Sequence, residues 1–200
     1  MFVNNDKKFI FAHVPKTGGI SVTKQLSIDF ASDDCSWELY NNYQHFSAFA
    51  LREKYPDYFF FSFVRNPYDR MISFYHFKDR QVVRAVRKTK LKNRVIFPPF
   101  KIFVKNLVEN GKMANLMTNS QKSFLCSKSG YMICDWVGRF ESLRDDYRHV
   151  LARFDDGVHD LIIHKNKSVD RKGLESYYDD ETRERVFRFW KEDFDEFGYF

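Results

Sequence analysis

The stretch FAHVPKTGGISVTKQL, residues 11–26, joins a run of apolar residues to a helical pattern through a proline, a lysine and two glycines. Residues 8–14 are almost continuously apolar and are followed by Pro15, which predicts a short buried strand. From Gly19 to about Ala31 the apolar residues follow helical spacing. The positions expected to be buried on this helix are Ile20, Leu26 and Phe30. The stretch predicts a strand, a loop and a helix in succession.

The loop in this stretch has the composition of an anion-binding site. A loop between a strand end and a helix N-terminus presents unpaired backbone N–H groups and the positive end of the helix dipole. Gly18 and Gly19 let the backbone approach a ligand closely, and Lys16 adds a full positive charge. The hydroxyl groups of Thr17 and Ser21 add hydrogen-bond donors. Phosphate or sulfate is the expected ligand, and a turn that binds nothing is the alternative.

The order of residues in the loop argues against an ATPase. A Walker A loop has the form GxxxxGK[ST], with glycines before the lysine, whereas here both glycines follow Lys16. A second buried strand is predicted over residues 57–64, and it leads into Arg65 where a magnesium-binding Asp would be expected. Arginine in place of a metal ligand indicates phosphate recognition without magnesium chemistry.

The second strand leads into FVRNPYDRMISFYHF, residues 63–77, which predicts a helix. Pro67 suits the first position of that helix and Asn66 suits its cap. Since the strand ends of an open α/β sheet face the ligand crevice, we expect Arg65 to meet the first loop there. Ser73 follows on the helix, and an Arg with a helical Ser can hold one phosphate by charge and hydrogen bonding. The alternative is that Arg65 caps the sheet edge and pairs with Asp69.

Strands alternate with helices along the rest of the chain, which predicts an α/β fold with a central, mainly parallel sheet flanked by helices in a three-layer sandwich. We expect one domain over residues 1–200. Further helices are predicted after Pro98-Pro99, near Ser142 with Asp145 in a capping-box position, and over Asp179–Phe194. Further strands are predicted over residues 131–140 and 160–164.

Taken together, the two stretches resemble sulfotransferases that use 3′-phosphoadenylyl sulfate (PAPS). HVPKTGGISV (13–22) resembles the phosphosulfate loop of that family, and VRNPYDRMISFY (64–75) resembles its 3′-phosphate element. GRFESLRDDY (138–147) and residues 177–199 extend the similarity over nearly the whole chain. The polysaccharide type, which includes heparan sulfate 2-O-sulfotransferase, is the most similar. The resemblance implies the P-loop-like form of the α/β fold.

The resemblance implies roles for individual residues. Lys16 would stabilise the leaving phosphate oxygen, while Arg65 and Ser73 would hold the 3′-phosphate. The residues that would hold the 5′-phosphosulfate are Thr17, Gly18, Gly19 and Ser21. Relatives commonly have Thr where this chain has Ile20, so we expect weaker cofactor binding here without loss of activity.

His45 lies where polysaccharide-type enzymes place a catalytic His, and imidazole that is neutral near pH 7 suits a general base. A structural loop histidine is the alternative. Relatives close over the nucleotide with a loop that corresponds to residues 164–173, so Lys167, Ser168 and Arg171 would reach the 3′-phosphate or adenine. We expect His13 to pack near the first loop and His76 to line the crevice.

The net charge of +6 indicates an anionic partner. Residues 78–105 hold ten Lys or Arg and one acid, whereas the C-terminal stretch is acidic. By resemblance, Lys88, Lys90, Lys92 and Arg94 would contact carboxylate or sulfate groups on a saccharide acceptor. A solvated helix face is the alternative.

Two other function classes stay open at this point. A P-loop phosphotransferase related to nucleotide kinases would require magnesium and ATP. A non-enzymatic module that grips an anionic polymer would show strong salt dependence, although no nucleic-acid motif is present. We expect PAPS and adenosine 3′,5′-bisphosphate as ligands, no metal requirement, no nucleic-acid partner and no stable membrane insertion.

The composition is that of a globular protein, and the sequence shows no signal-peptide pattern, which predicts a cytoplasmic protein. Because the similar Golgi enzymes carry a membrane anchor and none is visible here, we expect a prokaryotic or viral origin. Cys35, Cys126 and Cys134 have no metal-type spacing, so reduced structural thiols are expected.

Overall fold

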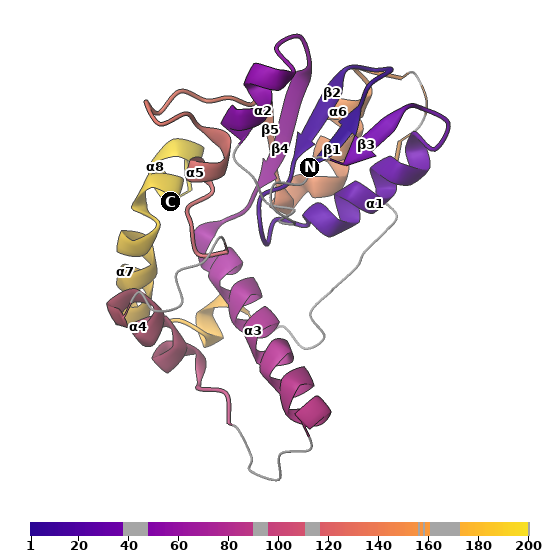
Figure 1. The fold of residues 1–200 in the computed structure, drawn as a ribbon. Helices are drawn as coiled ribbons and strands as arrows, with labels where there is room; N and C mark the ends of the chain where they lie inside the picture. Colours follow the sequence, from indigo (N-terminus) through magenta and orange to yellow (C-terminus); the bar gives the residue numbers. More distant parts are fainter. Residues whose placement is uncertain are drawn as a thin grey trace. The chain divides into compact units, whose positions relative to one another are not determined.

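The computed structural model describes residues 1–37, 48–89, 96–110, 117–155, 157, 159–160 and 173–199. The chain divides into two compact units (Figure 1). The first unit comprises Met1–Arg65 and Asn119–Lys167, and the second comprises Asn66–Thr118 and Ser168–Phe200. One sulfotransferase domain over residues 1–200 stays a prediction.

The first unit is built on a five-stranded sheet with the order β3-β1-β2-β4-β5. Its strands are β1 (Phe2–Asn4), β2 (Phe9–Ala12), β3 (Cys35–Trp37), β4 (Phe59–Val64) and β5 (Trp136–Arg139). Strand β1 pairs antiparallel with β2 and β3, while β2–β4 and β4–β5 are parallel pairs. All strands except β1 consequently run in one direction, which confirms a mainly parallel sheet.

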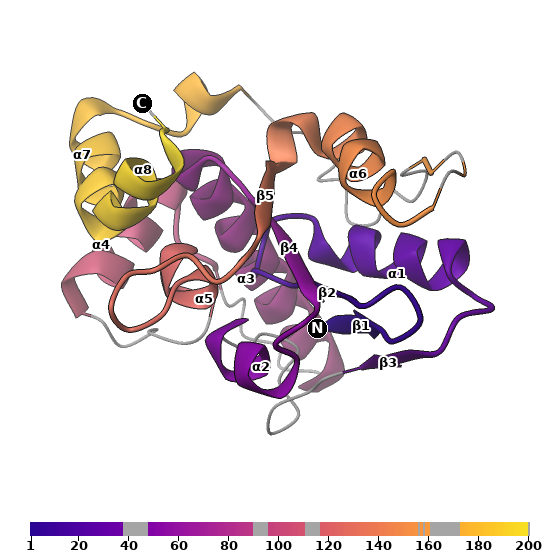
Figure 2. The same ribbon diagram turned by 90° about the horizontal axis from the view of Figure 1, so that it is seen from above.

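Helices cover both faces of this sheet (Figure 2). They are α1 (Gly19–Asp29), α2 (Ala48–Lys54), α5 (Lys122–Leu125) and α6 (Leu143–Leu151), with a 3₁₀ turn η1 (Phe140–Ser142) before α6. Helices α1 and α6 pack on one face, where the rings of Phe9, Phe11 and Phe61 are fully buried with Leu26. Helix α2 lies on the other face, where Arg52 stacks on the ring of Phe60 with 4.0 Å from Cζ to the ring centroid. The three-layer α/β arrangement is thereby confirmed.

The second unit is helical in the part that the structure describes. It contains α3 (Pro67–Thr89), α4 (Phe100–Asn110), the 3₁₀ turn η2 (Leu174–Ser176), α7 (Asp180–Phe189) and α8 (Lys191–Phe197). The predicted start of α3 is confirmed, since Oδ1 of Asn66 accepts a 2.9 Å hydrogen bond from the backbone N–H of Tyr68. Apolar side chains such as Phe74, Phe103 and Trp190 form its core.

Two expectations about helices were wrong, and in the first case a contact far along the chain accompanies the departure from the local pattern. Residues 179–194 form two helices, since Trp190 leaves the helical conformation at φ −123° and ψ 33°. Its buried indole N–H donates to the carbonyl of Thr118 at 2.8 Å. Ile20, expected in the core, is 45% exposed on the first turn of α1, whereas Leu26 and Phe30 are buried as predicted.

Two further expectations need correction. The capping contact at α6 comes from Asp146, whose Oδ2 accepts from the hydroxyl of Ser142 at 3.0 Å and from N–H of Arg139 at 2.6 Å; Asp145 was the wrong residue. The strand expected over residues 131–140 is limited to β5, because the chain before it turns back and forms an isolated bridge between Cys126 and Met132. Of the strand expected over residues 160–164, only residue 160 is described.

The three cysteines are present as thiols, in agreement with the prediction. Burial, with help from nearby carboxylates, raises the pKa of Cys35 to about 11. Burial likewise raises the pKa of Cys134 far above its usual range. Both side chains are neutral thiols near pH 7 and act as small packing groups. None of the described helices is both long enough and apolar enough to cross a bilayer.

Candidate functional site

The carboxyl ends of three parallel strands in the first unit gather the residues of the site. Strand β2 leads into the loop 13–18, β4 leads into Arg65, and β5 leads into Phe140. Because β4 lies between β2 and β5, these three segments are neighbours. Nη1 of Arg65 donates to the carbonyl oxygen of Lys16 at 3.3 Å. The expectation that Arg65 meets the first loop is confirmed.

The loop reaches α1 through two residues in the left-handed region. Lys16 has φ 72° and Gly18 has φ 83°. For Lys16, which carries a Cβ, this conformation costs roughly 1 kcal/mol of conformational energy. The carbonyl of Gly18 accepts from the N–H groups of Ser21 at 2.8 Å and Val22 at 3.2 Å, which starts the helix. The first turn of α1, all of it described, carries no acidic residue that would repel an anion.

Close packing requires glycine at position 19, and a positive φ favours it at position 18. A Cβ on Gly19 would overlap Cδ2 and Nε2 of His13, whose buried ring stacks on Phe11 with 6.0 Å between ring centroids. A Cβ on Gly18 would lie 3.1 Å from the ring of Phe140, in addition to its unfavourable φ. The expectation that His13 packs near the loop is confirmed.

The hydroxyl of Thr17 has a structural role in this loop. Its Oγ1 is buried and donates to the carbonyl of Val14 at 2.9 Å. A hydroxyl has one hydrogen to donate, so in this arrangement the hydroxyl of Thr17 has no hydrogen left to donate to an anion. Ser21 is also largely buried, one turn into the same helix.

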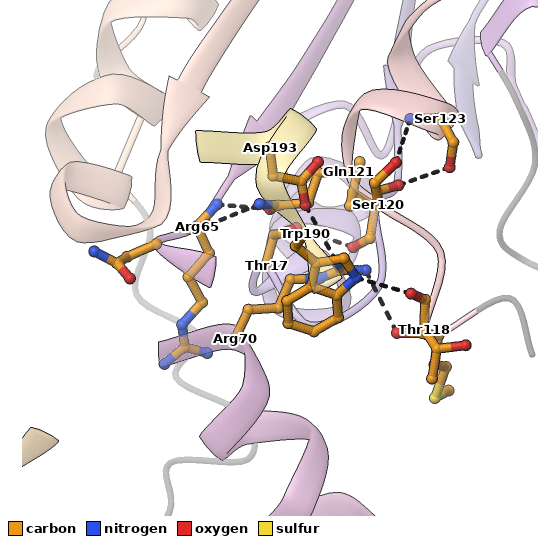
Figure 3. A network of polar contacts seen from close by, with 12 residues as sticks. Thr17, Arg65, Arg70, Thr118, Ser120, Gln121, Ser123, Trp190 and Asp193 are labelled. Atoms are coloured by element: carbon orange, nitrogen blue, oxygen red, sulfur yellow. Dashed lines mark hydrogen bonds and ion pairs between the residues drawn. The ribbon is translucent and has the colours of Figure 1, made fainter. Parts of the chain in front are cut away.

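Arg65 is held both at its backbone, as Figure 3 shows, and at its side chain. The backbone N–H of Arg65 donates to Oε1 of Gln121 at 2.8 Å, and Nε2 of Gln121 donates back to the carbonyl of Arg65 at 2.8 Å. The guanidinium stacks on Phe140, with 4.0 Å from Cζ to the ring centroid. Neither Gln121 nor Phe140 was predicted as a site residue, and a lone Gln 56 residues from its partner leaves no local signal.

The second unit carries Ser73, half-buried on α3. Arg70, one turn earlier on α3, meets Asp193 of α8 at 3.5 Å, and both side chains are fully buried (Figure 3). His76, one turn later, shares a 2.8 Å hydrogen bond between Nε2 and the hydroxyl of Tyr177. The role expected for Ser73 in binding a 3′-phosphate stays a prediction, as does a position of His76 at the crevice.

Several predicted residues lie outside the described part of the chain. They are His45, Lys90, Lys92, Arg94, Lys167, Ser168 and Arg171, together with the side chain of Lys88. Lys101, from the same basic stretch, pairs with Asp179 at 2.6 Å. That hydrogen bond from Lys101 holds the pKa of Asp179 well below its usual range. At least this one cation of the stretch serves the structure of the second unit.

The full sequence, residues 1–200, matches the model of the Sulfotransferase family. The chain belongs to the sulfotransferase family. No curated protein and no solved structure matches this sulfotransferase in the corresponding comparisons. Family membership supports an enzyme that transfers a sulfuryl group from a donor to an acceptor. The loop, the first turn of α1 and Arg65 supply N–H groups and positive charge that fit an anionic donor.

Proposed function

We propose that this sulfotransferase transfers the sulfuryl group of PAPS to a hydroxyl group of a saccharide. The observation that carries the proposal is the hydrogen bond of Arg65 to the carbonyl of Lys16, which joins the two nucleotide-type motifs at neighbouring strand ends. A cationic side chain beside a helix N-terminus suits a ligand with two anionic groups. Metal ions have no role in this proposal.

The binding roles follow the two motifs. The 5′-phosphosulfate is held by the N–H groups of Thr17, Gly18 and Gly19 and by Ser21. Arg65 and Ser73 hold the 3′-phosphate. Lys167, Ser168 and Arg171 contact the 3′-phosphate or the adenine. The exposed side chain of Ile20 offers an anion no hydroxyl, so affinity for the donor is lower than it would be with Thr at this position.

PAPS supplies the sulfuryl group, whose bond to the phosphate oxygen breaks as the acceptor oxygen bonds to sulfur. The ammonium group of Lys16 stabilises the negative charge that develops on the leaving phosphate. His45 accepts the proton of the acceptor hydroxyl as the general base. The products are a sulfate ester and adenosine 3′,5′-bisphosphate.

The acceptor is a saccharide that carries anionic groups, as in the heparan sulfate 2-O type. Lys88, Lys90, Lys92 and Arg94 contact its carboxylates or sulfates, and salt weakens these contacts. A cytoplasmic location completes the proposal.

Calorimetric titration tests the donor. In buffer with EDTA, adenosine 3′,5′-bisphosphate should bind the unaltered chain more tightly than ADP does, because ADP lacks a 3′-phosphate. Tighter binding of ADP that requires magnesium would instead support a kinase-like phosphotransferase. Binding of an anionic polymer that is unchanged in Lys16→Ala and Arg65→Met would support a non-enzymatic module.

A labelled-sulfate assay over saccharide, phenol and peptide acceptors tests the chemistry. Lys16→Ala and His45→Ala should abolish transfer, while circular dichroism shows that the fold survives. Matched controls are Lys128→Ala and His149→Ala, at exposed positions of the first unit, and both should keep the unaltered rate. Unaltered rates in Lys16→Ala and His45→Ala would refute the assigned roles.

A further inference from the structure

Arg65 lies one residue beyond the last paired position of its strand. The β4–β5 ladder ends at Val64, which pairs with Arg139, and the β2–β4 ladder ends at Ser62. Both backbone polar groups of Arg65 have left the sheet at this point. Because the residue is buried, these groups require partners other than water.

Gln121 supplies both partners from one side chain. Its Oε1 accepts from N–H of Arg65 and its Nε2 donates to C=O of Arg65, each at 2.8 Å. A carboxamide carries an acceptor and a donor side by side, so it replaces the peptide edge of a neighbouring strand. Gln121 is itself fully buried, which protects both bonds from exchange with water. We call these two hydrogen bonds between Gln121 and the backbone of Arg65 the Gln121 bracket, which Figure 3 shows.

The bracket fixes the backbone from which the guanidinium projects. The stack on Phe140 and the bond to Lys16 then fix the guanidinium itself. An arginine held in this way loses less conformational freedom when an anion binds, which favours affinity. A side chain that removes the bracket would let the backbone of Arg65 move, and displacement by about 1 Å can cost up to a hundredfold in function.

We infer that Gln121 is a positioning residue that sets Arg65 for recognition of the 3′-phosphate of the donor. This inference rests on the proposed function. Gln121 is not expected to contact the ligand. Through Arg65, it nevertheless contributes part of the affinity that the 3′-phosphate provides.

The test uses the ratio of dissociation constants of adenosine 5′-monophosphate and adenosine 3′,5′-bisphosphate, which isolates the contribution of the 3′-phosphate. Gln121→Met keeps the length of the side chain and removes both hydrogen bonds. It should lower this ratio about tenfold, with the affinity for adenosine 5′-monophosphate within about twofold of the unaltered value. Gln121→Glu keeps the acceptor for N–H of Arg65 and should have a smaller effect on the ratio.

Ser120→Ala is the matched control, since Ser120 is buried beside Gln121. It removes the 3.1 Å bond from N–H of Ser123 to the hydroxyl oxygen of Ser120 and leaves Arg65 untouched. The ratio should stay unaltered in Ser120→Ala, even though its thermal stability falls. An equal loss of ratio in Ser120→Ala and Gln121→Met, or a full ratio in Gln121→Met, would overturn the inference.

Hydrogen exchange tests the bond between N–H of Arg65 and Gln121 directly in the unaltered chain. The amide of Arg65 should exchange slowly before any nucleotide is added, because it is bonded to Gln121. Exchange as fast as in an exposed loop would also overturn the inference. If the unaltered chain binds the two nucleotides equally, the proposed recognition of the 3′-phosphate is refuted. That outcome is distinguishable from failure of the role inferred for Gln121, which appears in the variants or in the exchange of the Arg65 amide.

Discussion

Arg65 and Arg70 are both buried, one in each unit, and their surroundings differ. The guanidinium of Arg70 meets the carboxylate of Asp193 at 3.5 Å and lies 4.5 Å from the ring centroid of Trp190. The guanidinium of Arg65 meets a backbone carbonyl of the phosphosulfate-type loop and the ring of Phe140. Each arginine stacks on an aromatic ring, and the carboxylate that Arg70 meets has 0% side-chain exposure.

The different surroundings of Arg65 and Arg70 indicate two different uses of an arginine side chain. Within the second unit, Arg70 on α3 forms a buried ion pair with Asp193 on α8. A buried pair of this kind adds little net stability, but breaking it leaves one charge uncompensated. In our proposal, Arg65 instead directs its charge toward a ligand. Stability should respond most to changes at Arg70, and nucleotide affinity should respond most to changes at Arg65.

The largest expected effect is the loss of stability in Arg70→Met. The substitution leaves the carboxylate of Asp193 buried without its guanidinium, which should lower the free energy of unfolding by about 3–5 kcal/mol. The double variant Arg70→Met/Asp193→Leu should recover most of that loss, since it removes both charges. Urea unfolding followed by circular dichroism measures both. A single variant as stable as the unaltered chain would remove the distinction between the two arginines.

A smaller effect is expected on affinity in Arg65→Met. Loss of a charged hydrogen-bonding group should weaken binding of adenosine 3′,5′-bisphosphate by about tenfold to a hundredfold. Binding of adenosine 5′-monophosphate should change little, and the loss of stability should be less than in Arg70→Met. Isothermal titration measures the two affinities. Equal weakening for both nucleotides would mean that Arg65 does not recognise the 3′-phosphate.

The smallest effect concerns the exposed pair of Lys101 and Asp179 in the second unit. The hydrogen bond from Lys101, followed by that from Thr182, holds the pKa of Asp179 below its usual range. A lowered carboxyl pKa stabilises the fold above the unfolded pKa near about 4, and this stabilisation is lost as the pH falls further. Lys101→Met should lower Tm slightly at pH 7, because the pair is exposed.

Thermal unfolding at pH 7, 4 and 3 tests this dependence. The difference in Tm between the unaltered chain and Lys101→Met should shrink as the pH falls from 4 to 3. A difference that stays constant with pH would assign the effect of Lys101 to packing. In contrast to the pair of Arg70 and Asp193, this pair should tolerate loss of Lys101, because the exposed carboxylate of Asp179 keeps its hydrogen bond from N–H of Thr182 at the start of α7.

Local patterns were sufficient to predict the elements that position the loop and Arg65. The apolar runs predicted β2 and β4, and the Asn66-Pro67 pair predicted the start of α3. Parallel strand ends then predicted the contact of Arg65 with the first loop. These features depend on side-chain periodicity and on restricted backbone conformations, which neighbouring residues determine.

The features that were not predicted from the sequence depend on partners far along the chain. Strands β1 and β3 have three residues each, too few to show alternation, and they form by pairing with each other and with β2. The helix break at Trp190 depends on the carbonyl of Thr118, 72 residues away. The bracket of Gln121 is likewise invisible without the fold. The role of His45 as general base stays a prediction, because His45 lies outside the described residues.

The left-handed backbone of Lys16 has an evolutionary consequence. Glycine adopts φ 72° without a steric penalty, so Lys16→Gly would relieve strain on the order of 1 kcal/mol. The greater freedom of glycine in the unfolded chain offsets much of this gain, so selection for heat resistance alone would tolerate the change, although it removes the proposed catalytic ammonium group. A library screened for stability without an assay of transfer would therefore retain this variant, which by our proposal is well folded and inactive.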